Sequence, residues 1–180
     1  MFVDFCSGIR APVGFALAWC GWQVTAHDIE LGTDLASAQH DELWQRRDKV
    51  LARLWACPCS TFSRAREKRL SYSADGGPPV LRSDEHPKGV SGLSPRGQAR
   101  VDTDTLLACR AADWAEHSLS TGSTLTVIEN PRRSLLWALP EQQRLQEHEP
   151  GSLWTTTHAA SRARGERLKR FAPTLISLHR

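Results

Sequence analysis

Lysine is scarce in this sequence. The long apolar runs of membrane proteins and the signal segments of secreted proteins are not found in it either. Only four of the 23 basic residues are lysines, at positions 49, 68, 88 and 169. The longest apolar run, residues 13–22, is too short to span a bilayer, and no basic segment precedes it. We therefore predict that the run is a helix packed inside the fold of a soluble, intracellular protein (cytoplasmic, or nuclear in a eukaryote) with no membrane partner.

The cysteines lack the spacing of a disulfide framework or of a zinc site. There are five, an odd number, and without a secretory signal disulfides are not expected. Cys57 and Cys59 are closer together than the cysteines of a zinc knuckle, and no second pair follows. The sequence thus predicts no metal site. Four of the thiols are interpreted as small buried hydrophobic groups: Cys6, Cys20, Cys57 and Cys109.

The net charge of +3 is unevenly distributed. Residues 151–180 carry six basic residues and one acid, and residues 64–100 are also basic. Most of the basic side chains are arginines, whose planar guanidinium groups suit phosphates and base edges. A solvated surface with a basic tail explains this pattern as well as a nucleic-acid partner does.

The first 28 residues have the order strand, turn, helix, strand. Residues 1–5 are a short apolar strand, residues 12–22 a helix with Pro12 in its first turn, and residues 22–28 alternate as a second strand. This order is typical of a parallel α/β sheet that binds its ligand at the carboxyl ends of the strands. A chain of 180 residues fits a single domain with a substantial core.

The alternation of helix and strand continues along the chain. Residues 37–56 are predicted to be a helix that turns to strand near its end, and residues 101–119 a second helix. The clearest strand is residues 123–130, which are rich in β-branched side chains. Residues 68–100 are loop-like, and a loop of this length is usually functional or disordered. A short helix is predicted after Pro131.

Polar residues follow each predicted strand, and parallel strands place such residues at one edge of a sheet. An acid that ends the second strand, Asp28, is placed to bind ribose hydroxyls, although Asp28 taken alone is better explained as a turn carboxylate. Glu129 ends an apolar strand, where a carboxylate is costly without a partner. Such a glutamate can hydrogen-bond a ring nitrogen or act as an acid.

Three explanations compete for Cys59: a buried structural thiol, half of a metal site, and a nucleophile. Thiolates are strong nucleophiles, and nearby cations lower the pKa of a thiol. Arg64 and Arg66 are close enough in sequence to supply that positive field. A cysteine hydrolase lacks a convincing partner, because the nearest loop histidine, His86, lies on the long loop.

Taken in their order along the chain, the residues at these strand ends resemble motifs of the DNA cytosine-5 methyltransferases, which use S-adenosylmethionine. The resemblance runs through most of residues 2–137. DFCSGIRA is similar to the cofactor motif, HDIE to the ribose corner, GTDL to the adenine corner, PCSTFS to the catalytic loop and IENP to the strand end that grips the target cytosine. The stretches PCSTFSRAR, GGPPVLRS, EHPKG and ENPRRSLLW resemble a short, divergent subgroup of that family.

The resemblance implies a Rossmann-like class I methyltransferase fold, a mostly parallel sheet with helices on both faces, as a single domain. It assigns catalysis to Cys59 and Glu129. It implies these cofactor contacts: Phe5, Cys6, Gly8, Asp28, Ile29, Asp34 and Pro58. It implies these nucleic-acid contacts: Ser60, Ser63, Arg64, Arg66, Asn130, Arg162 and Arg164. The catalytic domain is expected over residues 1–150, with the active-site loop at about 60–100, followed by a basic segment over residues 151–180.

The implied reaction methylates carbon 5 of cytosine in DNA. The Cys59 thiolate attacks carbon 6 of a flipped-out base while Glu129 holds or protonates nitrogen 3. Two alternatives stay open: methylation of RNA, such as tRNA, and a degenerate relative that only binds nucleic acid. Arg10, which replaces a family glycine, and the lack of a target-recognition region favour the degenerate relative. A partner protein would then supply recognition.

Overall fold

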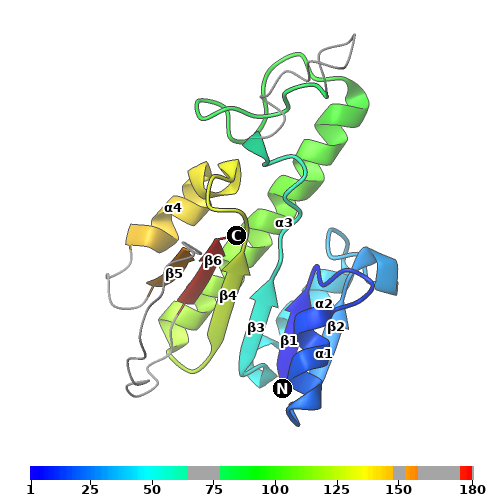
Figure 1. The fold of residues 1–180 in the computed structure, drawn as a ribbon, viewed down its shortest axis with the longest axis vertical. Helices are drawn as coiled ribbons and strands as arrows, with labels where there is room; N and C mark the ends of the chain where they lie inside the picture. Colours follow the sequence, from blue (N-terminus) through cyan, green and yellow to red (C-terminus); the bar gives the residue numbers. More distant parts are fainter. Residues whose placement is uncertain (65–77, 148–152, 158–174, 180) are drawn as a thin grey trace.

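The computed structural model describes residues 1–64, 78–147, 153–157 and 175–179. Six strands form one sheet in the order β2-β1-β3-β4-β6-β5, and every neighbouring pair is parallel. The chain therefore has an α/β fold with a parallel sheet, as expected (Figure 1). The strands are β1 (Phe2–Phe5), β2 (Val24–His27), β3 (Ala52–Trp55), β4 (Leu125–Glu129), β5 (Leu153–Thr157) and β6 (Leu175–His179).

The β1 strand lies between β2 and β3 and is buried at all four positions. From β1 the chain adds β2 on one side and then returns to add β3 on the other side. The strand order therefore changes direction between β1 and β3. In open parallel sheets, ligands bind in the crevice outside the carboxyl ends of the strands at this kind of switch point.

Helices flank both faces of the sheet (Figure 1). Helix α1 (Pro12–Trp19) lies on one face, where the Gly14 amide donates to Asp4 Oδ2 at 2.9 Å. Helix α3 (Pro95–Thr121) lies on the other, where the Trp114 ring packs 5.2 Å from the Phe5 ring. Successive side chains of a strand point to opposite faces, so the neighbours Asp4 and Phe5 place these helices on opposite sides of β1.

The core lies mainly between the sheet and α3. The rings of Phe5, Trp55 and Trp114 are fully buried, and the first two stack with centroids 4.3 Å apart. Each large apolar side chain buried in this way contributes about 1.5–3 kcal/mol. Two further helices cover α3: α2 (Gln39–Gln45) through Trp44, and α4 (Pro140–Glu147), whose Gln142 donates to the Ala108 carbonyl at 2.9 Å.

The prediction that residues 13–22 form a helix inside the fold is wrong about burial. The helix is present, but Phe15 is 69% exposed and Trp19 is 85% exposed. Only Gly14 of α1 is buried, because the helix rests on β1 through this glycine. Cys20, expected to be buried, is also exposed, whereas Cys57 is buried and Cys6 and Cys109 are half-buried.

Helix α3 begins earlier than expected, inside the segment that was predicted to be a loop. Ser94 caps it, since its hydroxyl accepts from the Gly97 amide at 3.2 Å, and Pro95 occupies the first turn. The short helix expected after Pro131 is a 3-10 helix (Leu135–Ala138), followed by α4. The sheet also continues beyond residue 150 through β5 and β6. Within the described ranges, no helix is both long and apolar enough to cross a membrane.

Candidate functional site

The carboxyl ends of β1, β3 and β4 lie side by side. Phe5 pairs with Trp55 in the sheet, and Trp55 pairs with Ile128. Beyond these pairs, the Ala56 amide donates to the Phe5 carbonyl at 3.1 Å. Cys6 follows β1 directly, Cys57 lies two residues beyond β3, and Glu129 is the last residue of β4. These residues are therefore neighbours at one edge of the sheet, beside the switch point.

The turn after β1, residues 6–11 (the β1 turn), has a strained backbone. Cys6 has φ 55° and Ala11 has φ 36°, and in the described part of the chain they are the only non-glycine residues with positive φ. Each such residue costs about 1–3 kcal/mol, and strain of this kind concentrates at functional sites. Gly8, at φ 64°, adopts the same region without a steric penalty, and no atom lies within 4 Å of where a Cβ would be.

Two carboxylates hold the β1 turn. Asp28 accepts from the Gly8 amide through Oδ2 and from the Glu30 amide through Oδ1, both at 2.9 Å. Glu30 Oε2 accepts from the Ile9 amide at 3.1 Å. The acid that was predicted to bind ribose therefore shapes the first turn as well, because one carboxylate joins the end of β2 to the end of β1.

The residues predicted to contact a cofactor divide into two groups. Asp28, Asp34 and Pro58 are half-buried and Ile29 is exposed, so these four remain accessible at the ends of the strands. Phe5 is fully buried between Trp55 and Trp114. Its ring is therefore part of the core and is not accessible to a cofactor, contrary to the contact that the resemblance implied.

Residues 57–62, the anchored loop, present the Cys59 thiol to solvent. At one end, Cys57 is buried and its carbonyl accepts from Asn130 Nδ2 at 2.8 Å. At the other end, Thr61 and Phe62 are buried, and the Phe62 carbonyl accepts from the Leu135 amide at 2.9 Å. Cys59 and Ser60 are exposed between these two fixed points.

A buried arginine fixes the second end of the anchored loop. Arg82 donates to Thr61 Oγ1 from Nε at 3.3 Å and from Nη2 at 3.2 Å, and to the Val101 carbonyl at 2.8 Å. The Thr61 hydroxyl donates in turn to Asp104 Oδ2 at 2.5 Å. The Arg82 guanidinium also lies 3.8 Å from the Phe62 ring centroid. Arg82, Thr61 and Asp104 thus connect the loop to α3.

The three thiols at this edge differ in their chemistry. Burial raises the pKa of Cys6 to about 12, and the charge of Asp28 adds to the shift. Burial also raises the pKa of Cys57 well above its ordinary value, and the charges of Asp104 and Glu129 act in the same direction. Cys6 and Cys57 therefore remain protonated at neutral pH. Cys59 is the thiol at this edge that is open to a substrate.

Two residues that were predicted to contact nucleic acid have structural roles instead. Asn130 is fully buried and holds the Cys57 carbonyl, so it cannot reach a ligand. Arg64 pairs with Asp84 through both terminal nitrogens and donates from Nε to the Arg133 carbonyl at 2.9 Å. Its guanidinium is therefore paired within the chain.

Of the other predicted nucleic-acid contacts, the structure describes Ser60 and Ser63. Ser60 is exposed and its hydroxyl accepts from Arg100 Nη2 at 3.3 Å, while Ser63 is half-buried. Arg66, Arg162 and Arg164 lie outside the described residues.

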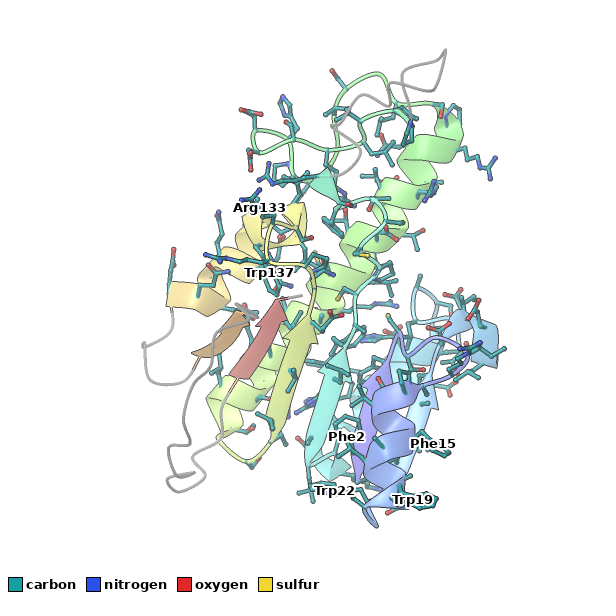
Figure 2. The ribbon with its side chains drawn as sticks, in the orientation of Figure 1. Phe2, Phe15, Trp19, Trp22, Arg133 and Trp137 are labelled. Carbon is teal, nitrogen blue, oxygen red and sulfur yellow. The ribbon has the colours of Figure 1, made fainter. Side chains whose placement is uncertain are left out.

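Sequence reasoning missed three exposed arginines near the carboxyl edge. Arg132 and Arg133 follow Asn130 and Pro131 directly and are exposed, and Arg133 is labelled in Figure 2 above the end of β4. Arg100 reaches the anchored loop from α3. The run of two arginines after ENP was a usable signal for the first two, but the position of Arg100 on α3 was not visible in the sequence.

The described residues contain no cluster of three or more His, Cys, Asp and Glu side chains that could hold a metal ion. No protein-family model matches the chain, and no curated protein or solved structure is significantly similar to it.

Proposed function

We propose that the protein is a DNA cytosine-5 methyltransferase that uses S-adenosylmethionine. The main observation in favour is the exposed thiol of Cys59, which the anchored loop presents at the sheet edge where Glu129 ends β4. An exposed thiol on a fixed loop, at the same edge of the sheet as a carboxylate, suits nucleophilic attack on a heterocyclic base whose ring nitrogen the carboxylate can hold.

The residues at the ends of β1 and β2 fit S-adenosylmethionine. Its ribose hydroxyls and adenine amine are donors. The half-buried carboxylate of Asp28 is an acceptor that also holds the strained β1 turn, and Asp34, further along the chain, offers a second half-buried carboxylate. Gly8 leaves room for close approach of a ligand, and Arg10, where the family has a glycine, is exposed. When bound, the sulfonium would supply the methyl group that carbon 5 of the cytosine receives.

The chain's own residues would act on the base. The Cys59 thiolate adds to carbon 6, and Glu129 holds nitrogen 3, which makes the ring an acceptable electron sink. A base then takes the carbon-5 proton, and the Cys59 sulfur leaves as the thiolate. Because the target must leave the stack to reach the thiol, Arg100, Arg132 and Arg133 would contact the phosphates that flank it.

Covalent trapping tests this proposal. A DNA that contains 5-fluorocytosine carries no proton on carbon 5, so the adduct cannot resolve after methyl transfer. With S-adenosylmethionine present, we expect the wild type and Cys20→Ser to form a covalent complex on a denaturing gel and Cys59→Ser to form none. Cys20 is the matched control because it is the other exposed cysteine. An adduct that survives in Cys59→Ser would contradict the assigned nucleophile.

Calorimetric titration with S-adenosylmethionine and S-adenosylhomocysteine tests the cofactor site separately. We expect binding that Asp28→Ala abolishes and that Glu42→Ala, an exposed acid on α2, leaves unchanged. Absence of binding by the folded wild type would instead favour the alternative function, a module that binds nucleic acid without catalysis. The burial of Phe5 favours that alternative, since it removes an aromatic contact that the cofactor would otherwise gain.

The substrate and the partners are also proposals. We favour DNA and retain RNA, such as tRNA, as the alternative, and the trapping experiment with a 5-fluorocytosine RNA distinguishes them. The target-recognition region of the family was not identified in the sequence, so we propose that a partner protein supplies it.

A further inference from the structure

The segment that leaves β4, residues 130–138 (the β4 exit), runs beside the anchored loop. Asn130 Nδ2 donates to the Cys57 carbonyl at 2.8 Å, and the Leu135 amide donates to the Phe62 carbonyl at 2.9 Å. Both contacts join residues that are 73 positions apart (57 to 130 and 62 to 135), so the two segments run in the same direction. Cys59 and Arg132 each lie two residues beyond the first contact and therefore occupy corresponding positions.

Two arginines of the β4 exit carry charges that the described part of the chain does not pair. Arg132 and Arg133 are exposed, and neither side chain forms a hydrogen bond or an ion pair with a described residue. The Arg133 carbonyl, and not its guanidinium, is the group that accepts from Arg64 Nε. Residues 130–138 contain no acid. The β4 exit therefore offers two guanidinium groups beside the thiol, and phosphate is an anion whose geometry they match.

An aromatic side chain accompanies these charges. Trp137 packs against the hydrophobic core and is half-buried, so part of its ring reaches the surface. Its indole Nε1 donates to the Pro131 carbonyl at 2.9 Å, which fixes the ring within the β4 exit. Figure 2 shows Trp137 and Arg133 in the same region, beyond the end of β4. A ring that is already fixed loses little conformational entropy when a planar group stacks on it.

Cations and an aromatic ring on one segment are the combination that binds an unpaired nucleic-acid strand. The cations follow the phosphates of the backbone, and a base stacks on the aromatic side chain. In a duplex the bases are paired and stacked on one another, so their faces are closed to a tryptophan at the protein surface. An acidic peptide would pair with the arginines, but its carboxylates would not stack on the indole.

We propose that Arg132, Arg133 and Trp137 form a subsite for an unpaired strand, and that the substrate cytosine is presented in single-stranded DNA. This inference rests on the proposed function for the identity of the target base. Trp137 stacks on a base next to the target, and the two arginines bind the phosphates that flank it. Because Arg132 and Cys59 occupy corresponding positions on neighbouring segments, a strand bound in this way passes the thiol.

The subsite selects for strand state and not for sequence. Every base has a face that can stack, and an arginine–phosphate contact is the same beside any base. An unpaired cytosine also needs no extraction from a duplex before the thiol can reach carbon 6, so the energy of unpairing is not required.

Fluorescence anisotropy with a labelled oligonucleotide tests the proposal without catalysis. The wild type is titrated with a single strand that contains one cytosine and with the same sequence as a blunt duplex. We expect the single strand to bind about 10-fold more tightly. Trp137→Leu keeps an apolar contact with the core but has no aromatic face, so it should weaken single-strand binding about 10-fold and leave duplex binding unchanged. Trp137→Phe should restore most of the affinity.

The salt dependence of the same titration tests the arginines. Arg133→Gln should weaken single-strand binding and reduce the slope of log affinity against log salt by about 0.7–1, the value for one phosphate contact. Trp22→Leu and Arg46→Gln are the matched controls and should bind like the wild type. Both residues are exposed, Trp22 in the turn after α1 and Arg46 in the segment before β3, away from the carboxyl edge.

Two results would overturn the proposal: a duplex that binds as tightly as the single strand, and a folded Trp137→Leu variant with wild-type affinity for the single strand. Circular dichroism melts check that each variant is folded. Binding is measured without S-adenosylmethionine and in Cys59→Ser, so the two proposals fail separately. Trp137-dependent binding without covalent trapping would contradict methyl transfer alone, whereas trapping confined to duplex DNA would contradict the single-strand subsite alone.

Discussion

The two parts of the candidate site are stabilised in different ways. The anchored loop is held by buried side-chain hydrogen bonds from distant parts of the chain, and the Thr61–Asp104 and Asn130–Cys57 contacts each join segments more than 40 residues apart. The β1 turn is held by carboxylates at the end of β2 and carries strained backbone. The nucleophile is thus fixed by satisfied polar groups, while the turn proposed to meet the cofactor stores strain.

The largest effect should come from Arg82, which fixes the anchored loop. Replacing Arg82 with Met removes the cation near the buried Asp104 carboxylate. Thr61 Oγ1 and the Val101 carbonyl also each lose a hydrogen-bond donor. Leaving a buried polar group unsatisfied costs about 1–3 kcal/mol, and more for a charged group such as the Asp104 carboxylate. We expect urea denaturation to show a loss of this size in the free energy of unfolding.

Arg53 is the matched control for Arg82. It is also fully buried, and burial lowers the pKa of each arginine to about 10. Arg53, however, donates from Nη2 to the hydroxyls of Ser118 and Thr124, and its Nε and Nη1 have no hydrogen-bond partner among the described residues. Arg53→Met should therefore cost much less than Arg82→Met. Equal losses would show that burial alone, and not the polar network, stabilises the loop.

A smaller effect is expected from Thr61, the hydroxyl between the two charges. Thr61→Val keeps the shape of the side chain but leaves the Asp104 carboxylate without its 2.5 Å hydrogen bond. An unsatisfied buried acceptor costs about 1–3 kcal/mol. Thr61→Ser retains the hydroxyl and should restore most of the loss in the same urea titration. If Thr61→Val is as stable as the wild type, the hydroxyl does not link Arg82 to Asp104.

The sequence was informative about local structure and about where polar residues leave the sheet. The short apolar runs before Cys6 and Asn130 predicted β1 and β4, because strand patterns depend on neighbouring residues. The corners at Asp28, Cys59 and Glu129 then followed from the rule that parallel strands share a carboxyl edge. In the structure, Asp28 directly follows β2, Glu129 is the last residue of β4, and Cys59 lies in the segment that follows β3.

Burial and long-range pairing were not accessible from the sequence. Phe5 and Asn130 resembled ligand contacts, but both are enclosed by residues that are distant in the chain. Arg64 was interpreted as a phosphate contact, since nothing in the sequence showed that Asp84, 20 residues away, would neutralise it. Nothing in the sequence distinguished Arg82 from the other residues of its loop, because its contact with Thr61 depends on the fold.

Replacing alanine with glycine normally destabilises a fold, but in the β1 turn we expect this substitution to stabilise it. Ala11 has φ 36°, and an alanine in the left-handed region costs about 1–2 kcal/mol, whereas glycine does not pay this cost. Glycine also loses about 0.4–1 kcal/mol through the entropy of the unfolded chain. We expect Ala11→Gly to stabilise the fold by about 0.5–1 kcal/mol in thermal and urea unfolding.

Ala99→Gly is the control for this prediction. Ala99 is exposed within α3, so the same substitution should destabilise the fold by about 1 kcal/mol. Opposite signs for the two variants would confirm that the strain is specific to the β1 turn. A loss of stability in Ala11→Gly would mean that the turn is not strained at this residue.

The smallest effect is a dependence of stability on pH. It should have opposite signs for Asp4, beneath α1, and for Asp84, next to the anchored loop. Burial raises the pKa of Asp4, beneath α1, and the charge of Asp28 adds to the shift. The folded state therefore keeps this proton to a higher pH than the unfolded state, so stability falls as the pH rises from roughly 4, the ordinary carboxyl value, through the raised pKa. Asp4→Asn should remove this fall in a series of urea titrations.

Asp84, which pairs with Arg64 next to the anchored loop, supplies the opposite case. The hydrogen bond from Arg64 lowers the pKa of Asp84, so its contribution is present above the ordinary carboxyl pKa and is lost as the pH falls through the lowered value. Asp84→Asn should therefore weaken the fold slightly near neutral pH and leave it unchanged in strong acid. If both variants changed stability with pH in the same direction, the contrast between a desolvated carboxylate beneath the β1 turn and a paired one at the anchored loop would be wrong.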